Sequence, residues 1–215
     1  MPPAGRRPVL LVEGEGDRVA VPELVRTVCH RLDLHDVQPA PHPIKCGGIS
    51  KLRADGTLER FVTYACQRQD GDSVLLVLDC EDDCPVDIVR ELTRRAALVV
   101  ERYNKKAGIA LLRREFETLF LASIESISLR YPAYGWELAA LDPADDPELY
   151  RGAKERLRSA MKKSKYRETR DQVRFVTALD LDLLAERSRP YRHLESVLLW
   201  LHTKNDSFVH PQIGE

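Results

Sequence analysis

Acidic residues follow two apolar segments of this chain, and carboxylates placed in this way are suited to binding a divalent cation. Glu13 comes directly after Val9–Val12, and Asp79 comes directly after Val74–Leu78, with Glu81 two residues further on. Carboxylate oxygens with room for water are the ligands that Mg²⁺ and Mn²⁺ prefer, and such ions bridge to substrate phosphates. The pattern therefore indicates metal-assisted chemistry on a phosphate ester.

The two apolar segments must be strands if these acids are to meet. Neither segment alternates polar and apolar residues, which is typical of strands buried on both faces of a parallel sheet. Strands and helices alternate along the first half of the chain, which predicts an α/β fold with a doubly wound parallel sheet of about four strands flanked by helices. Ligands of such sheets bind at the carboxyl ends of the strands, where Glu13 and Asp79 should converge.

A second interpretation is that these acids are ordinary helix N-terminal residues, stabilised by the helix dipole. It suits Asp82, Asp83 and Asp87, which lie beside Pro85. Asp17 lies one helical turn after Glu13, so it is a candidate for the metal site or a cap of the helix expected after it. For Glu81, too, both interpretations stay open, a metal ligand or an ordinary acid near a helix N-terminus.

The remaining segments give a weaker pattern. Three prolines make a strand around Val37–Ile44 an edge strand at best. The next residues, Lys45–Lys51, contain two glycines and two lysines, which suits a phosphate-holding loop, although the Gly-Lys-Ser/Thr pattern of a P-loop is missing. Pro22 should lie in the first turn of its helix or mark its start.

We expect two parts in the chain, an α/β domain over residues 1–130 and a helical C-terminal extension packed on it over residues 131–215. The second part should open with a linker rich in Pro, Ala and Asp over 131–148. Three helices should follow, at about 148–163, 171–187 and 191–202.

Positive charge is concentrated in Arg151–Arg174, which holds ten Lys or Arg against three acids, although the formal net charge of the whole chain is -1. Such a segment attracts polyanions and suits a nucleic-acid backbone. The alternative is a solvated helix face balanced by the acidic stretch Asp142–Glu148. Tyr166 and Phe175 are candidates for stacking on a base. The candidate phosphate contacts are Lys45, Lys51, Lys154, Lys162, Lys163 and Arg192.

Composition excludes some classes of protein. The chain has 215 residues, of which 43% are hydrophobic and 31% charged, which is enough for one full core. No apolar run approaches the roughly 20 residues that cross a bilayer, so we expect no membrane partner. Five scattered cysteines without a secretory signal predict reduced thiols and a cytoplasmic location. The sequence leaves a homo-oligomer open.

The ordered motifs resemble a known fold. Leu11-Val12-Glu13-Gly14 with Asp17 four residues after the glutamate, followed later by Asp79-Cys80-Glu81, is similar to the two motifs of the Toprim fold of topoisomerases, bacterial primases and overcoming-lysogenization-defect nucleases. Over most of its length the chain resembles the small stand-alone Toprim-like proteins of the DUF4276 family. The further stretches that carry this likeness are Glu115–Ala122, Ala153–Glu155 and Arg189–Leu194.

The resemblance implies a role for each acid. Glu13 would act in general acid/base chemistry or bind metal, while Asp79 and Glu81 would bind Mg²⁺ or Mn²⁺. Asp17 would be the second acid of the Glu-x-x-x-Asp pattern of the nuclease branch. The usual residue at the position of Glu81 is Asp, so Glu81 would offer the same charge on a longer side chain. Glu117 would be an additional ligand, or else a solvated helix acid.

The resemblance further implies a Mg²⁺- or Mn²⁺-dependent nuclease that hydrolyses phosphodiester bonds of nucleic acid, above all DNA, with Glu13 and Asp79 as catalytic residues. Lys154 would contact a phosphate. Such nucleases often work with a separate ATPase, frequently in defence against phage. The alternative is a non-catalytic Toprim-like module that docks to an ATPase or to DNA. A third function, nucleotidyl transfer, lacks a nucleotide-binding motif in this sequence.

Overall fold

The structure is a computed structural model, and it describes residues 6–80, 82–141, 148, 151–203 and 207–211. Two expectations of the sequence analysis lie outside these residues. Glu81 is one of them. The other is the balancing acidic stretch Asp142–Glu148, of which only Glu148 is described.

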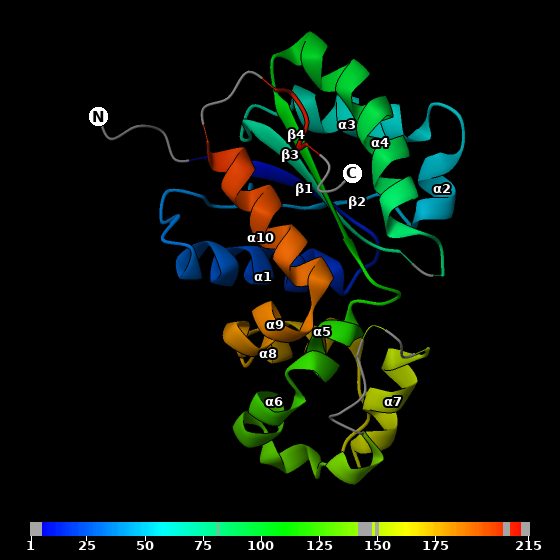
Figure 1. The fold of residues 1–215 in the computed structure, drawn as a ribbon, viewed down its shortest axis with the longest axis vertical. Helices are drawn as coiled ribbons and strands as arrows, with labels where there is room; N and C mark the ends of the chain where they lie inside the picture. The colour runs from blue at the N-terminus through cyan, green and yellow to red at the C-terminus, as the bar shows by residue number, and fades with distance from the viewer. Residues whose placement is uncertain (1–5, 81, 142–147, 149–150, 204–206, 212–215) are drawn as a thin grey trace.

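The centre of the molecule is a parallel sheet of four strands, β1 (Pro8–Val12), β2 (Ile44–Lys45), β3 (Ser73–Asp79) and β4 (Lys106–Leu112). The strand order is β2-β1-β3-β4, and every neighbouring pair is parallel (Figure 1). The predicted sheet is confirmed. The edge strand is shorter than expected, because Ile44 is the first residue of β2 and Val37 pairs only singly, with Arg6.

Ten helices are described. They are α1 (Asp17–Arg31), α2 (Ile49–Arg53), α3 (Thr57–Gln67), α4 (Pro85–Val100), α5 (Glu117–Ala122), α6 (Ile124–Arg130), α7 (Ala153–Ala160), α8 (Glu168–Val176), α9 (Leu181–Arg187) and α10 (Arg189–His202). Three-residue 3-10 turns lie at Glu101–Tyr103, Pro132–Tyr134 and Leu138–Ala140. No helix in the described residues is long and apolar enough to span a membrane.

Successive strand residues face opposite sides of the sheet, and each side is covered by its own helices. Leu10 and Val12 of β1 belong to one apolar core, which includes residues of α1 and α10. Val9 and Leu11 belong to the other, which includes residues of α2, α3 and α4. Because both faces are covered, β1 is buried along its whole length, as its uninterrupted apolar sequence predicts.

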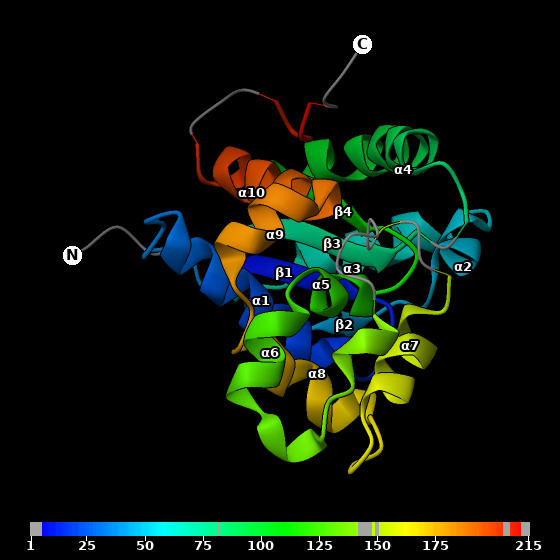
Figure 2. The same ribbon diagram turned by 60° about the horizontal axis from the view of Figure 1, so that its bottom comes forward.

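Helices α5 to α9 gather at the lower end of the molecule in Figure 1, away from α3 and α4, and Figure 2 turns this end towards the viewer. Helix α10 then returns to pack along β4, and α8 packs along α1. The division of the chain at residue 130 stays a prediction.

Three local predictions are wrong. The expected single helix over 171–187 is interrupted between α8 and α9, because the side chain of Asp180 caps the first turn of α9. The expected loop Lys45–Lys51 already turns into α2 at Ile49. Pro22 lies inside α1, beyond its first turn, since α1 begins at Asp17.

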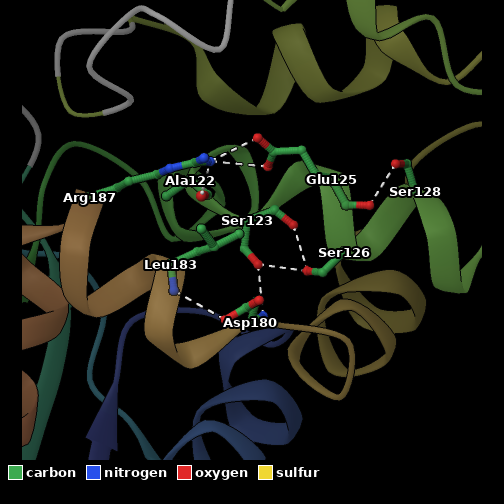
Figure 3. Close-up of polar contacts among 8 residues, drawn as sticks. All are labelled: Ala122, Ser123, Glu125, Ser126, Ser128, Asp180, Leu183 and Arg187. Atoms are coloured by element: carbon green, nitrogen blue, oxygen red, sulfur yellow. Dashed lines mark hydrogen bonds and ion pairs between the residues drawn. The ribbon is translucent and has the colours of Figure 1, made fainter.

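A buried serine cluster fixes the interruption between α8 and α9 (Figure 3). The Oγ atom of Ser123 accepts a hydrogen bond from the backbone N–H of Asp180 at 2.8 Å and lies 2.7 Å from the Oγ atom of Ser126. Ser126 also donates to the carbonyl of Ala178 at 2.7 Å. On the same side, Arg187 of α9 contacts both carboxylate oxygens of Glu125 at 2.9 and 3.1 Å. These contacts join α6 to the C-terminal helices.

Five cysteines are present in the chain, and all of them are free thiols. Cys29, Cys46, Cys66 and Cys80 are buried, whereas Cys84 is exposed. The prediction that these thiols are reduced in the cell stays a prediction.

We expect Gly108→Ala to lower the free energy of unfolding by about 1–3 kcal/mol, because a Cβ atom at Gly108 of β4 would lie 2.4 Å from Cγ1 of Val197 in α10. The measurement is urea denaturation of both single variants and the double variant Gly108→Ala/Val197→Ala. The second substitution makes room, so the double variant should lose less than the sum of the two losses. Additive losses would contradict this packing.

Candidate functional site

The first acids of the candidate site are placed by two adjacent strands. Val12 of β1 pairs with Val77 of β3, so Glu13, just after β1, and Asp79, the last residue of β3, lie at the same carboxyl edge of the sheet. The backbone N–H of Phe116, which precedes α5, donates a hydrogen bond to the Asp79 carboxylate. Glu13 and Asp79, the two catalytic candidates of the sequence, are therefore brought to one edge.

Four carboxylates interact at this edge. The pKa of Asp79 is raised well above its ordinary value, first by burial and then by the negative charges of Asp17, Glu13 and Glu117. Burial is also the main cause of the raised pKa of Asp17 and of the raised pKa of Glu117. Like charges at close range in a poorly solvated place disfavour ionisation, so this cluster needs positive charge to be fully ionised.

Asp17 closes the turn between β1 and α1. It is the first residue of α1, and its Oδ2 atom accepts a hydrogen bond from the backbone N–H of Gly14 at 2.7 Å. The carboxylate thus reaches back towards the end of β1 and does not act as the expected N-cap. This turn holds Asp17 on the same side as Glu13.

Glu13 lies against the glycine loop that follows β2. A Cβ atom at Gly48 would be 3.0 Å from the Glu13 Oε1 atom, so a side chain at this position would crowd the carboxylate. Beside it, Cys46 donates its backbone N–H to the Val12 carbonyl at 2.9 Å, and burial raises the pKa of its thiol to about 12. The loop therefore shapes one wall of the site with an inert thiol and two glycines.

Glu117, at the start of α5, is almost completely buried, with 1% of its surface exposed. Its Oε1 atom accepts hydrogen bonds from the Tyr166 hydroxyl at 2.7 Å and from Nε2 of Gln172 at 3.3 Å. The alternative of a solvated helix acid is therefore wrong. Tyr166 and Phe175 are also buried and stack on one another, so the interpretation of these rings as base-stacking residues is wrong.

Lys154, in the first turn of α7, supplies positive charge to the cluster. Its charge lowers the pKa of both Asp17 and Glu117. Burial acts to lower the pKa of Lys154 itself, but Glu117 and Glu168 outweigh it, and the net shift is upward. The Lys154 Nζ atom lies 3.1 Å from Glu168, and its backbone N–H donates to Glu115 at 2.8 Å.

The other expected phosphate contacts are spread over the molecule. Lys45 is the partner of Val12 in the sheet and lies 3.4 Å from Glu15, and Lys51 lies over the ring of Phe61. Lys162 forms an ion pair with Glu137 at 2.6 Å, and Lys163 lies against Gly135. Arg192 donates to the carbonyls of Ala185 and Glu186 at the end of α9. Their role in binding phosphate stays a prediction.

The gathered side chains fit a divalent cation by their chemistry. Glu13, Asp17, Asp79 and Glu117 offer only oxygen donors, which Mg²⁺ and Mn²⁺ prefer. Within the described residues, no three His, Cys, Asp or Glu side chains are already arranged to hold a metal ion, and Glu81 lies outside those residues. The cluster therefore has the donors and the need for positive charge, without a preformed coordination shell.

Sequence reasoning missed two residues that hold Glu117, one between α7 and α8 and one in α8. Tyr166 and Gln172 are some 50 residues away from Glu117 along the chain, and neither belongs to a motif. Glu168, which adds its negative charge beside Asp17, was counted only as an acid within the basic segment. No spacing rule connects such positions, because packing of α8 on α1 brings them to the site.

Comparison with known proteins places the chain in a family. The family described as "Domain of unknown function (DUF4276)" matches residues 12–199. The chain belongs to the DUF4276 family. No curated protein matches this DUF4276 chain.

Three solved structures are similar to this DUF4276 chain, and all are of the C-terminal region of the Xanthomonas campestris pv. campestris OLD protein. They were phased with iodine, mercury and platinum, and their TM-scores are 0.45, 0.43 and 0.44. Each is 15% identical in sequence, and each match covers 92% of this chain. The matches cover 98%, 98% and 96% of those chains.

Asp79→Asn is expected to raise the melting temperature of the metal-free DUF4276 chain at about pH 8, because it removes a carboxylate whose pKa burial and three acids raise. A carboxyl with a raised pKa in the folded state destabilises the fold as the pH rises above about 4, its ordinary range. The gain should therefore vanish as the pH is lowered towards 4. Each kcal/mol of repulsion that the substitution relieves should raise the melting temperature by roughly 2–4 °C.

The measurement is thermal unfolding in EDTA across this pH range, with Asp87→Asn as control. Asp87 is an exposed acid in the first turn of α4, paired with Arg90 at 3.3 Å. A variant Asp79→Asn that melts below the wild type at about pH 8 would contradict the proposed repulsion among the acids.

Proposed function

We propose that this member of the DUF4276 family is a Toprim-type nuclease that uses Mg²⁺ or Mn²⁺ to hydrolyse phosphodiester bonds of nucleic acid, DNA above all. The observation that carries the proposal is that Asp17, Glu13 and Glu117 all lie close enough to Asp79, at the carboxyl edge of the sheet, to raise the pKa of its buried carboxyl. This is the edge at which open α/β sheets bind ligands. Acids that repel one another there are explained by a cation that joins them.

Each residue has a proposed role. Asp79, Asp17 and Glu117 would hold the cation, with Glu81 as a further proposed ligand. A bound divalent ion would neutralise charge on the phosphoryl group and acidify water. Glu13, half-buried just after β1, would accept the proton of the attacking water. Lys154 would contact a phosphate from the first turn of α7.

We also propose that the chain works with a separate ATPase protein, in defence against phage. The glycine loop Lys45–Lys51 lacks the Gly-Lys-Ser/Thr pattern that binds nucleotide phosphates, so ATP hydrolysis would have to come from another chain. The proposed chemistry itself uses only the residues of this chain, so cleavage is expected without ATP. A module that docks to the ATPase or to DNA without cutting is the competing function.

Glu13→Gln and Asp79→Asn are each expected to lower cleavage at least about 100-fold, because the first removes the proposed proton acceptor and the second removes a ligand of the proposed cation. The measurement is cleavage of plasmid and single-stranded DNA in Mn²⁺, with Asp87→Asn as the matched control acid on the surface of α4. Equal cleavage by all four proteins would contradict the proposal. Absence of cleavage by all of them, with DNA binding retained, would favour the docking module.

Lys154→Met is expected to slow cleavage about tenfold, whereas Lys162→Met should leave it unchanged. The reason is that Lys154 influences Asp17 and Glu117, while Lys162 is exposed and pairs with Glu137. Steady-state kinetics of both variants, with their melting temperatures as a check on folding, make the comparison. Equal losses would instead indicate diffuse attraction between the basic segment and DNA.

A further inference from the structure

Gln172 of α8 joins two acids of the site that are far apart in the chain. Its amide donates a hydrogen bond from Nε2 to Oε1 of Glu117 at 3.3 Å. The Gln172 side chain is also hydrogen-bonded to the carboxylate of Asp17. One neutral side chain therefore contacts an acid at the start of α1 and an acid at the start of α5.

The carbonyl of this amide has an unused hydrogen-bonding capacity. Gln172 is 3% exposed, and its Oε1 atom has no hydrogen-bond partner among the described residues. A buried oxygen without a partner costs about 1–3 kcal/mol and calls for an explanation. Because Oε1 belongs to the amide that contacts two carboxylates of the site, it is an additional oxygen donor beside them.

Gly16 makes room for this amide. A Cβ atom at Gly16 would lie 2.2 Å from Oε1 of Gln172 and 3.1 Å from Cβ of Glu168. The φ angle of Gly16 is -62°, which any residue adopts, so the need for glycine here comes from space and not from backbone conformation. The glycine at position 16, between β1 and α1, thus allows the Gln172 amide to lie close to the backbone.

A neutral residue is suited to this position. A fifth carboxylate would add to the repulsion that already acts on Asp79. An amide instead offers N–H groups that draw Glu117 and Asp17 together, and an oxygen as well. An apolar residue of the same size would offer neither.

We propose that Gln172 is a positioning residue that holds Glu117 and Asp17 in place to bind a divalent cation, and that its Oε1 atom would serve as a further oxygen donor. The inference rests on the proposed function, because it deepens the role of the same site. It assigns to α8, in the segment that was expected to bind nucleic acid through its charge, a role in shaping the cation site.

The test measures Mn²⁺ binding to the full chain by calorimetry, together with the electron paramagnetic resonance spectrum of the bound ion. Gln172→Met keeps the size of the side chain and removes its polar atoms, and Gln172→Glu keeps an oxygen but loses the N–H donors. Both variants should bind Mn²⁺ about tenfold more weakly or worse, with an altered spectrum, because partners that orient metal ligands contribute about 10–100-fold to affinity. Gln67→Met is the matched control and should bind Mn²⁺ like the wild type. Gln67 is an exposed residue of α3 whose side chain contacts Tyr103.

Melting temperatures in EDTA separate this role from a structural one, since a positioning residue should change Mn²⁺ affinity more than stability. If Gln172→Met fails to fold, Gly16→Ala is the second variant, because its methyl group must displace the amide while Gln172 itself remains. Wild-type affinity in Gln172→Met or Gln172→Glu would overturn the positioning role.

Asp79→Asn shows which proposal has failed. If the wild type binds Mn²⁺, Asp79→Asn does not, and Gln172→Met binds like the wild type, only the inference about Gln172 falls. If neither the wild type nor Asp79→Asn binds Mn²⁺, the proposed function falls, and the role of Gln172 falls with it.

Discussion

Repulsion among four carboxylates at one edge of the sheet is the constraint on which the rest of the structure depends. The parallel pairing of β1 with β3 places Glu13 beside Asp79, and burial keeps water from screening them. A fold that gathers acids in this way must add compensating contacts. Those contacts come from the other half of the chain: Tyr166 and Gln172 donate to Glu117, and Lys154 acts on Glu117 and Asp17.

The C-terminal helices are therefore part of the site's architecture. Helix α8 must be held firmly if Gln172 is to contact Glu117, and a buried acid does this at its first turns. Asp171 accepts hydrogen bonds from the Tyr134 hydroxyl and the Arg167 backbone N–H, both at 2.7 Å, and pairs with Arg170 at 2.6 Å. Because Arg170 and Tyr134 outweigh the effect of burial, the pKa of Asp171 is lowered. Asp171 is thus an anchoring charge, in contrast to the acids at the sheet edge.

The sequence predicts those parts of the fold and site that depend on local pattern. Uninterrupted apolar runs identify β1 and β3, and the residues at their ends follow directly, which is why Glu13 and Asp79 are found. Burial of Glu117 cannot be read in the same way, because the partner that buries it, Tyr166, is 49 residues away. The break before α9 combines the local cap of Asp180 with a contact of similar range, since Ser123, 57 residues away, accepts a hydrogen bond from the backbone of Asp180. Local patterns carry no information on contacts of this range.

Charge counted along the sequence overstates the basic segment for the same physical reason. Lys162 pairs with Glu137, and Arg151 pairs with Asp82, so acids outside the segment offset part of its charge in the fold. Such exposed pairs contribute only about 0–1 kcal/mol each, and a polyanion competes with them readily. Lys154 differs because it lies between Glu117 and Glu168, partly removed from solvent. Under the proposed function, the segment attracts a phosphate backbone through salt-sensitive charge, whereas Lys154 alone among these three cations has the contacts to fix a phosphate beside the acids.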